Sequence, residues 1–269
     1  MVMRGPNRDF LKDILALGAG NYCDIFSVHF YMKPSGLPPE KTIPSLQKAI
    51  DHYKKMIKDY GGEKELWDSE SGYKVISFYE DIKNQPYGRK DKWAKESISA
   101  ENQAHYLVRN YILHIANGLK WFYFNLDKRP IYAYGAPGLI EYDTTPLPAM
   151  VAYAVLSSKL EGMQYETKIE MSKGNECYIF SKKNETSKSR PLFLIAAWNW
   201  QVVNEPVKWH IAIPPSRLKA YNIMGDEVSV EPYNESFLVN ISGSPLYFES
   251  SGFKLNDLIK AFQNVQYNY

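Results

Sequence analysis

The sequence predicts an α/β region followed by an all-β domain. Strand-like and helix-like segments alternate through about residue 162, which is the pattern of a parallel sheet with crossover helices. From Tyr165 onward, short strand-like runs separated by Gly, Pro and Asn replace this alternation, as in a β-sandwich. Hydrophobic residues make up 45% of the 269 residues, which is enough for a sizeable core. We therefore expect two domains, 1–162 and 163–269.

In the first region, helices are predicted where apolar residues recur every three or four positions and a Gly follows the last of them. The predicted helices span residues 7–18, 43–60, 99–117 and 148–160. Strands are predicted where β-branched and aromatic residues run together. The predicted strands span residues 2–3, 23–31, 63–70 and 119–124. A long loop is expected over residues 71–92, and loops of this length in compact domains are often functional.

The second region is predicted to consist almost entirely of short strands. They span residues 166–171, 177–180, 192–198, 208–213, 220–223, 236–241 and 246–249. Residues 255–262 are predicted to form a short helix. No internal repeat or low-complexity segment interrupts either region.

Composition and charge exclude several classes of protein. The formal net charge of +2 gives no reason to expect nucleic acid or an anionic membrane as partner. No apolar run approaches the roughly 20 residues of a membrane span, and the first residues lack a signal-peptide core, so the compartment stays open. Cys23 and Cys177 form no metal or redox motif, and we expect no metal and no cofactor. The 14% aromatic content suits both sugar subsites and ordinary cores.

The stretch 64–72 ends an apolar, strand-like run with a carboxylate. Leu66 and Trp67 precede Glu70, and Gly72 follows it. A buried parallel strand delivers a side chain to the rim of its sheet at such a point, where the chain turns away. A carboxylate fixed there can attack an electrophilic carbon or hold a proton. Glu70 is therefore a candidate catalytic residue, with a solvated carboxylate at a strand end as the alternative.

Several segments of the first region carry motifs of a known family. Residues 24–31 (DIFSVHFY) have the pattern Asp-hydrophobic-Ser-x-His-x-Tyr, and residues 66–72 (LWDSESG) place Trp, Ser and Gly around the Glu. These motifs resemble the sixth and seventh barrel strands of clan A glycoside hydrolases, especially the family 39 β-xylosidase-like enzymes. Residues 102–109 and 118–125 are similar to the seventh helix and the eighth strand of that family.

The resemblance implies a (β/α)8 TIM barrel and retaining hydrolysis of O-glycosyl bonds, with Glu70 as the nucleophile. His29 and Tyr31 share one face of their strand and would lie in the sugar site beside Glu70. The alternative for His29 is a core histidine bonded to a backbone carbonyl. The implied partner is an oligosaccharide or glycoside substrate.

The resemblance also implies that Trp121 stacks on the sugar. Phe122 or Tyr123 could hold that place instead, because the register of a short apolar run is open. Trp67 is expected to pack inside the barrel. Other aromatic and ionisable residues have simpler explanations: the core of the second domain for Trp198 and Trp200, no catalytic role for Glu65 and Asp68, and no metal-ligand spacing for His52, His105 and His114.

Against this family, the chain corresponds to about strands 5–8 of the barrel and a C-terminal β-domain. The general acid/base Glu of the family lies on the fourth strand, in an Asn-Glu-Pro-like motif, so that half is expected to be missing from this chain. Asn204-Glu205-Pro206 spells the motif, but we interpret it as a turn between two strands. The alternative function is a catalytically silent carbohydrate-binding or structural half-barrel. Either way, we expect self-association or a partner supplying the missing half-barrel.

Overall fold

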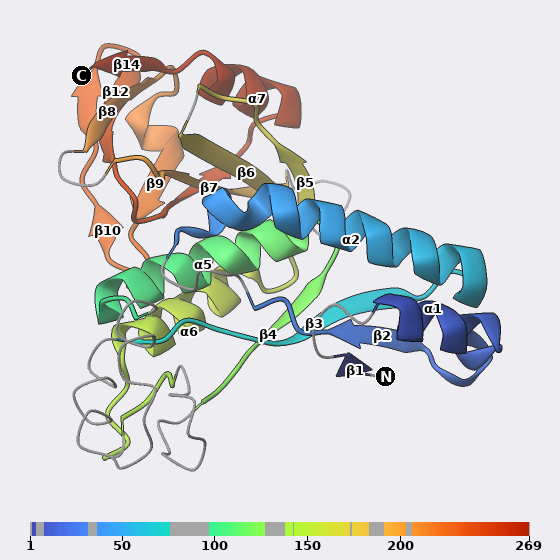
Figure 1. Ribbon diagram of the computed structural model, residues 1–269. Coiled ribbons are helices and arrows are strands. Elements are labelled where there is room, and N and C mark those ends of the chain that lie inside the picture. Colours follow the sequence, from blue (N-terminus) through green and yellow to red (C-terminus); the bar gives the residue numbers. More distant parts are fainter. Residues whose placement is uncertain are drawn as a thin grey trace. The chain divides into compact units, whose positions relative to one another are not determined.

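The computed structural model describes residues 2–3, 8–31, 37–75, 97–126, 138–141, 143–172, 174–182, 191–202 and 206–268 (Figure 1). The chain divides into two compact units, Met1–Leu147 and Pro148–Tyr269. The helix Pro148–Leu160 (α6) falls with the second unit, whereas the sequence-based division after residue 162 groups it with the first. That domain boundary stays a prediction.

The first unit contains a four-stranded parallel sheet in the order β1-β2-β3-β4. Its strands are β1 (Val2–Met3), β2 (Ile25–Val28), β3 (Glu65–Ser71) and β4 (Lys120–Tyr123). Helices connect successive strands: α1 (Arg8–Ala16) with the short 3-10 helix η1 (Ala19–Tyr22), α2 (Pro39–Gly61) and α5 (Ala100–Ala116). The predicted alternation of strand and helix is confirmed.

Local sequence explains where the helices begin. Ser99 caps α5, because its side chain accepts a hydrogen bond of 3.0 Å from the backbone N–H of Asn102. The helix α2 starts at Pro39 rather than at residue 43, since proline fits the first turn of a helix, where its missing N–H costs nothing.

The two faces of the parallel sheet differ in character. Phe26, Val28 and Leu66 point toward the helices and share a buried core with residues of α1 and α2. Side chains alternate along a strand, so Trp67 and Phe122 lie on the opposite face. Their rings contact each other with centroids 5.3 Å apart, and 44% of Phe122 is exposed. The sheet therefore has one apolar face beneath helices and one open face with aromatic residues.

A buried ion pair joins α2 to α5. Arg109 Nε donates to Glu40 Oε1 at 2.7 Å, and a second guanidinium nitrogen of Arg109 donates to Glu40 Oε2. The side chains are 3% and 2% exposed. The guanidinium also lies 5.0 Å from the ring centre of Tyr106. Two charges removed from water in this way depend on each other for compensation.

The second unit consists of α6 followed by two antiparallel sheets and a short helix. The strand orders are β10-β9-β13-β7-β6-β5 and β11-β12-β8-β14. The elements are β5 (Gln164–Lys168), β6 (Asn175–Lys182), β7 (Leu192–Asn199), β8 (Val207–Ile211), η2 (Pro215–Arg217), β9 (Leu218–Tyr221), β10 (Glu227–Val228), β11 (Glu231–Tyr233), β12 (Ser236–Ile241), β13 (Leu246–Ser251), α7 (Leu255–Gln263) and β14 (Gln266–Asn268).

Residues of both sheets and of α7 share one apolar core, which includes Ile195, Trp209, Phe237, Phe248 and Phe262. All seven predicted strands and the predicted short helix are found in this unit. The strands β10, β11 and β14 were not predicted, because two or three residues are too few to show a period.

Trp198 belongs to the interior of the second unit. It is fully buried, and its ring stacks on Tyr178 with centroids 5.3 Å apart. This agrees with a role in the core rather than on a carbohydrate-binding surface.

Removing one partner of the buried ion pair will destabilise the first unit. We expect Glu40→Ala to lower the free energy of unfolding by about 3–5 kcal/mol, because Arg109 would remain buried without its counter-charge. Urea denaturation of the full chain measures this change. The matched control is Asp59→Ala, which removes an exposed 2.9 Å pair with Lys55 on the same helix and should leave the unfolding free energy almost unchanged. Equal effects of the two substitutions would contradict the assignment.

Candidate functional site

Glu70 lies at the carboxyl end of β3, where the strand departs from regular pairing. Asp68 pairs with Trp121 and Ser71 pairs with Tyr123, so two residues of β3 face a single residue of β4. This β-bulge contains Ser69 and Glu70. A bulge turns the side chains of the inserted residues away from the regular alternation, and bulges are frequent beside active sites.

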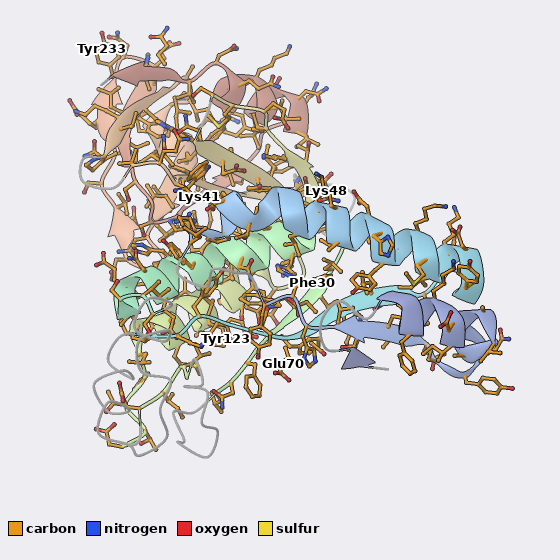
Figure 2. All side chains as sticks on the ribbon, viewed as in Figure 1. Phe30, Lys41, Lys48, Glu70, Tyr123 and Tyr233 are labelled. Atoms are coloured by element: carbon orange, nitrogen blue, oxygen red, sulfur yellow. The ribbon has the colours of Figure 1, made fainter. Side chains whose placement is uncertain are left out.

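Two side chains from the end of β2 reach Glu70. Tyr31 Oη donates a hydrogen bond of 2.7 Å to Glu70 Oε1, and His29 Nδ1 lies 3.5 Å from Glu70 Oε2. The Glu70 side chain is 26% exposed and the His29 side chain 8%. Between them, Phe30 packs on Tyr53 of α2, with ring centroids 6.0 Å apart, so it points to the helix-covered face (Figure 2). The structure therefore brings together three of the four predicted site residues.

This arrangement gives each oxygen of the Glu70 carboxylate its own neighbour. Tyr31 holds one oxygen by a hydroxyl donor, and the imidazole of His29 stands beside the other. The carboxylate stays accessible to a ligand. A fixed, accessible carboxylate with oriented donors can act as a nucleophile toward an electrophilic carbon or bind a hydroxyl-rich ligand.

Trp121 does not lie with these residues, and its predicted role as a sugar platform is wrong for this structure. It is only 5% exposed, its indole N–H donates to Ser71 Oγ, and its ring stacks on His114 at 5.3 Å. The side chain faces the helices because of the alternation along β4. Phe122, on the open face, is the exposed aromatic residue of this strand.

Tyr123 is also turned toward the helices. Its hydroxyl accepts a hydrogen bond of 2.9 Å from Gln103 Nε2 and donates to the carbonyl of Tyr73 at 3.3 Å. Burial raises the pKa of Tyr123 well above its ordinary value, and the two hydrogen bonds offset part of this effect. The residue therefore serves the packing between β4 and α5.

Asp68 is a buried residue that the sequence analysis did not select. It is 0% exposed, accepts a 2.8 Å hydrogen bond from Ser71 Oγ, and lies with Oδ2 3.2 Å from His114 Nε2. One signal was available: Asp68 has the same parity along β3 as the core residue Leu66, so a charged group was expected in the interior.

The remaining expectations concern other parts of the chain. Asn204 and Glu205 of the Asn-Glu-Pro triplet lie outside the described residues, as does most of the predicted loop over 71–92. Within the described ranges, His, Cys, Asp and Glu form no group of three or more that could hold a metal ion. In the same ranges, every helix is too short or too polar to cross a membrane.

Two neighbouring substitutions on β4 test the assignment of its faces. We expect Trp121→Phe to lower the free energy of unfolding by about 1–3 kcal/mol, because the buried Ser71 hydroxyl loses its donor. Phe122→Leu, on the open face, should have a smaller effect. Chemical denaturation of both variants decides the matter, and a larger loss for Phe122→Leu would reverse the assignment.

Alkaline pH should destabilise the first unit through Tyr123. Its pKa is higher in the folded than in the unfolded chain, so the stabilisation is complete below the unfolded pKa of about 10 and is lost as pH rises beyond it. Each such group contributes up to about 1.4 kcal/mol per pH unit. Unfolding measured between pH 9 and 11 should therefore show a shallower pH dependence in Tyr123→Phe. An unchanged slope would contradict the expectation.

Comparison with known proteins bears on the fold. The chain matches no protein-family model and no curated protein. Among solved structures, it is similar to a family 39 glycoside hydrolase from the gut symbiont Bacteroides cellulosilyticus WH2, with a TM-score of 0.64 and 20% identity over 90% of this chain and 47% of that chain. It is also similar to a family 51 α-L-arabinofuranosidase from Bifidobacterium longum, with a TM-score of 0.53 and 12% identity over 93% of this chain and 58% of that chain.

These two likenesses agree with the resemblance of the strand motifs at the level of fold. The chain spans about half the length of these solved structures. At identities this low, they do not assign it to family 39. The chain has the mixed helix-and-sheet fold of glycoside hydrolases.

Proposed function

We propose that the chain carries the nucleophile side of a retaining glycoside hydrolase site, with Glu70 as the nucleophile. The observation that supports this most directly is the contact of Glu70 with Tyr31 and His29 at the carboxyl edge of a parallel sheet. In barrel enzymes, catalytic groups gather at this edge. The order β1-β2-β3-β4 and the fold likeness support strands 5–8 of a (β/α)8 barrel followed by a β-sandwich.

In the proposed reaction, a Glu70 oxygen attacks the anomeric carbon of a glycoside as the bond to the leaving oxygen breaks. The product is a glycosyl ester of Glu70 and an alcohol, which takes its proton from a general acid. Water then attacks the anomeric carbon, its proton passes to the same group acting as base, and the Glu70 carboxylate is regenerated. Tyr31 and His29 hold the attacking carboxylate in one orientation.

The general acid/base is assigned to residues outside this sequence. A retaining enzyme requires a second carboxyl group about 5–5.5 Å from the nucleophile. The chain spans 47% of the family 39 structure, which leaves the other half of such a barrel to another polypeptide. A partner chain that supplies the first barrel strands, or self-association, would complete the ring around the open face of the sheet.

The nucleophile can be tested without the acid/base. A 2,4-dinitrophenyl 2-deoxy-2-fluoroglycoside has a leaving group that departs without a proton, and its fluorine slows hydrolysis of the ester. We expect a panel of such β-glycosides to add one fluoroglycosyl group to the chain, located on Glu70 by peptide mass spectrometry.

Two variants provide the controls for this labelling. Glu70→Gln should abolish it, because an amide is a poor nucleophile. Glu65→Gln should retain it, since Glu65 lies at the other end of β3, where it accepts from Trp67 and pairs with Lys120. Labelling that persists in Glu70→Gln, or is absent from the wild-type chain, would overturn the proposal.

The second candidate function is a catalytically silent half-barrel that binds carbohydrate or pairs with another chain. The exposed Phe122 beside Trp67 favours it, because an aromatic surface can bind a sugar ring or a second protein surface. This alternative predicts measurable glycoside binding in calorimetry without any covalent labelling of Glu70.

A further inference from the structure

A buried polar cluster lies directly beneath the candidate nucleophile. We define the Asp68 cluster as Asp68, Ser71, His114 and Trp121. Asp68 is completely buried, and its carboxylate accepts from the backbone N–H of Phe30 at 3.1 Å and from Ser71 Oγ at 2.8 Å. His114 Nε2 lies 3.2 Å from the same carboxylate. The cluster therefore connects β3 to the chain that follows β2 and to helix α5.

The atoms that Asp68 binds belong to the two segments that form the candidate site. Phe30 stands between His29 and Tyr31, so its amide fixes the backbone from which both side chains reach Glu70. Ser71 follows Glu70 directly and is the first residue after the bulge to pair with β4. A single carboxylate thus fixes both the nucleophile's strand and the segment that carries its donors.

The direction of each hydrogen bond in the cluster can be assigned from its neighbours. His114 Nδ1 lies 2.8 Å from the carbonyl of Asn110, which can only accept, so we assign a hydrogen to this nitrogen. One further proton lies between His114 Nε2 and Asp68. Trp121 can only donate to Ser71, and this leaves the Ser71 hydroxyl hydrogen for Asp68. Trp121 and His114 also stack.

We propose that Asp68 is a positioning residue for Glu70, acting through hydrogen bonds to Phe30 and Ser71 rather than by contact with substrate. This inference rests on the proposed function, because it gives Glu70 a geometry to be maintained. Displacement of a reacting group by about 1 Å can reduce a rate about 100-fold. Loss of Asp68 would release the Phe30 amide and the Ser71 hydroxyl together.

The experiment compares labelling of Glu70 by the fluoroglycosides in three variants, at a temperature where each is folded by circular dichroism. Asp68→Ala should slow labelling by about 10- to 100-fold. Asp68→Asn should restore most of the rate, because its oxygen can accept from Phe30 while its amide donates to Ser71 and His114. Glu40→Ala breaks the other buried carboxylate pair of the same unit and should label at nearly the wild-type rate.

A normal rate in Asp68→Ala would overturn the inference. So would an Asp68→Asn rate as low as that of Asp68→Ala, because Asp68 would then act through its charge. If Asp68→Ala does not fold, Ser71→Ala takes its place, since it removes one hydrogen bond of the cluster and should also slow labelling relative to Glu40→Ala.

A second measurement does not depend on reactivity. The carboxyl ¹³C signal of Glu70, assigned by its loss in Glu70→Gln, should move when Tyr31→Phe removes the hydroxyl donor. The displacement should be smaller when Asp68→Ala or Ser71→Ala is already present, and unchanged with Glu40→Ala. If the wild-type chain is not labelled, the proposed function fails, but this measurement still decides whether Asp68 positions Glu70. Equal displacements in all backgrounds would overturn the inference.

Discussion

The parallel pairing of β2 with β3 is the constraint on which the candidate site depends. Val28 pairs with Asp68, so the chain leaves the two strands at the same edge of the sheet. His29 and Tyr31 then reach the level of Glu70, although about 40 residues separate them in sequence. The register of two strands therefore brings the site together before any side-chain hydrogen bond is made.

The different faces of this sheet explain how a polar site and an apolar core coexist so closely. Residues such as Phe26 and Leu66 fill the space below the helices, and Asp68 is the charged exception in that row. Burying a carboxylate is costly unless it is hydrogen-bonded, and here three donors meet it. The bulge that follows turns Glu70 out of the row. One irregularity in β3 thus separates a buried carboxylate from an accessible one.

The sequence predicted the elements well where periodicity is long, as in α2 and α5, and the strand motifs identified Glu70, His29 and Tyr31. The role of Trp121 could not be predicted, because four consecutive aromatic residues of β4 look alike until their register is known. The bulge shifts pairing by a single residue and leaves no mark in composition. The partnership of Asp68 with His114 joins residues 46 apart, on a strand and a helix whose packing only the fold determines.

The position of the buried pair favours a catalytic site over a silent wall of a barrel. Well-packed apolar residues can often replace a buried ion pair without loss of stability, so stability alone does not account for Asp68 and His114. Their hydrogen bonds reach Phe30 and Ser71, which adjoin the donors of Glu70 and Glu70 itself. A surface that bound sugars only by stacking would gain nothing from fixing these atoms. A nucleophile gains directly, because its rate depends on where its oxygen stands when the anomeric carbon arrives.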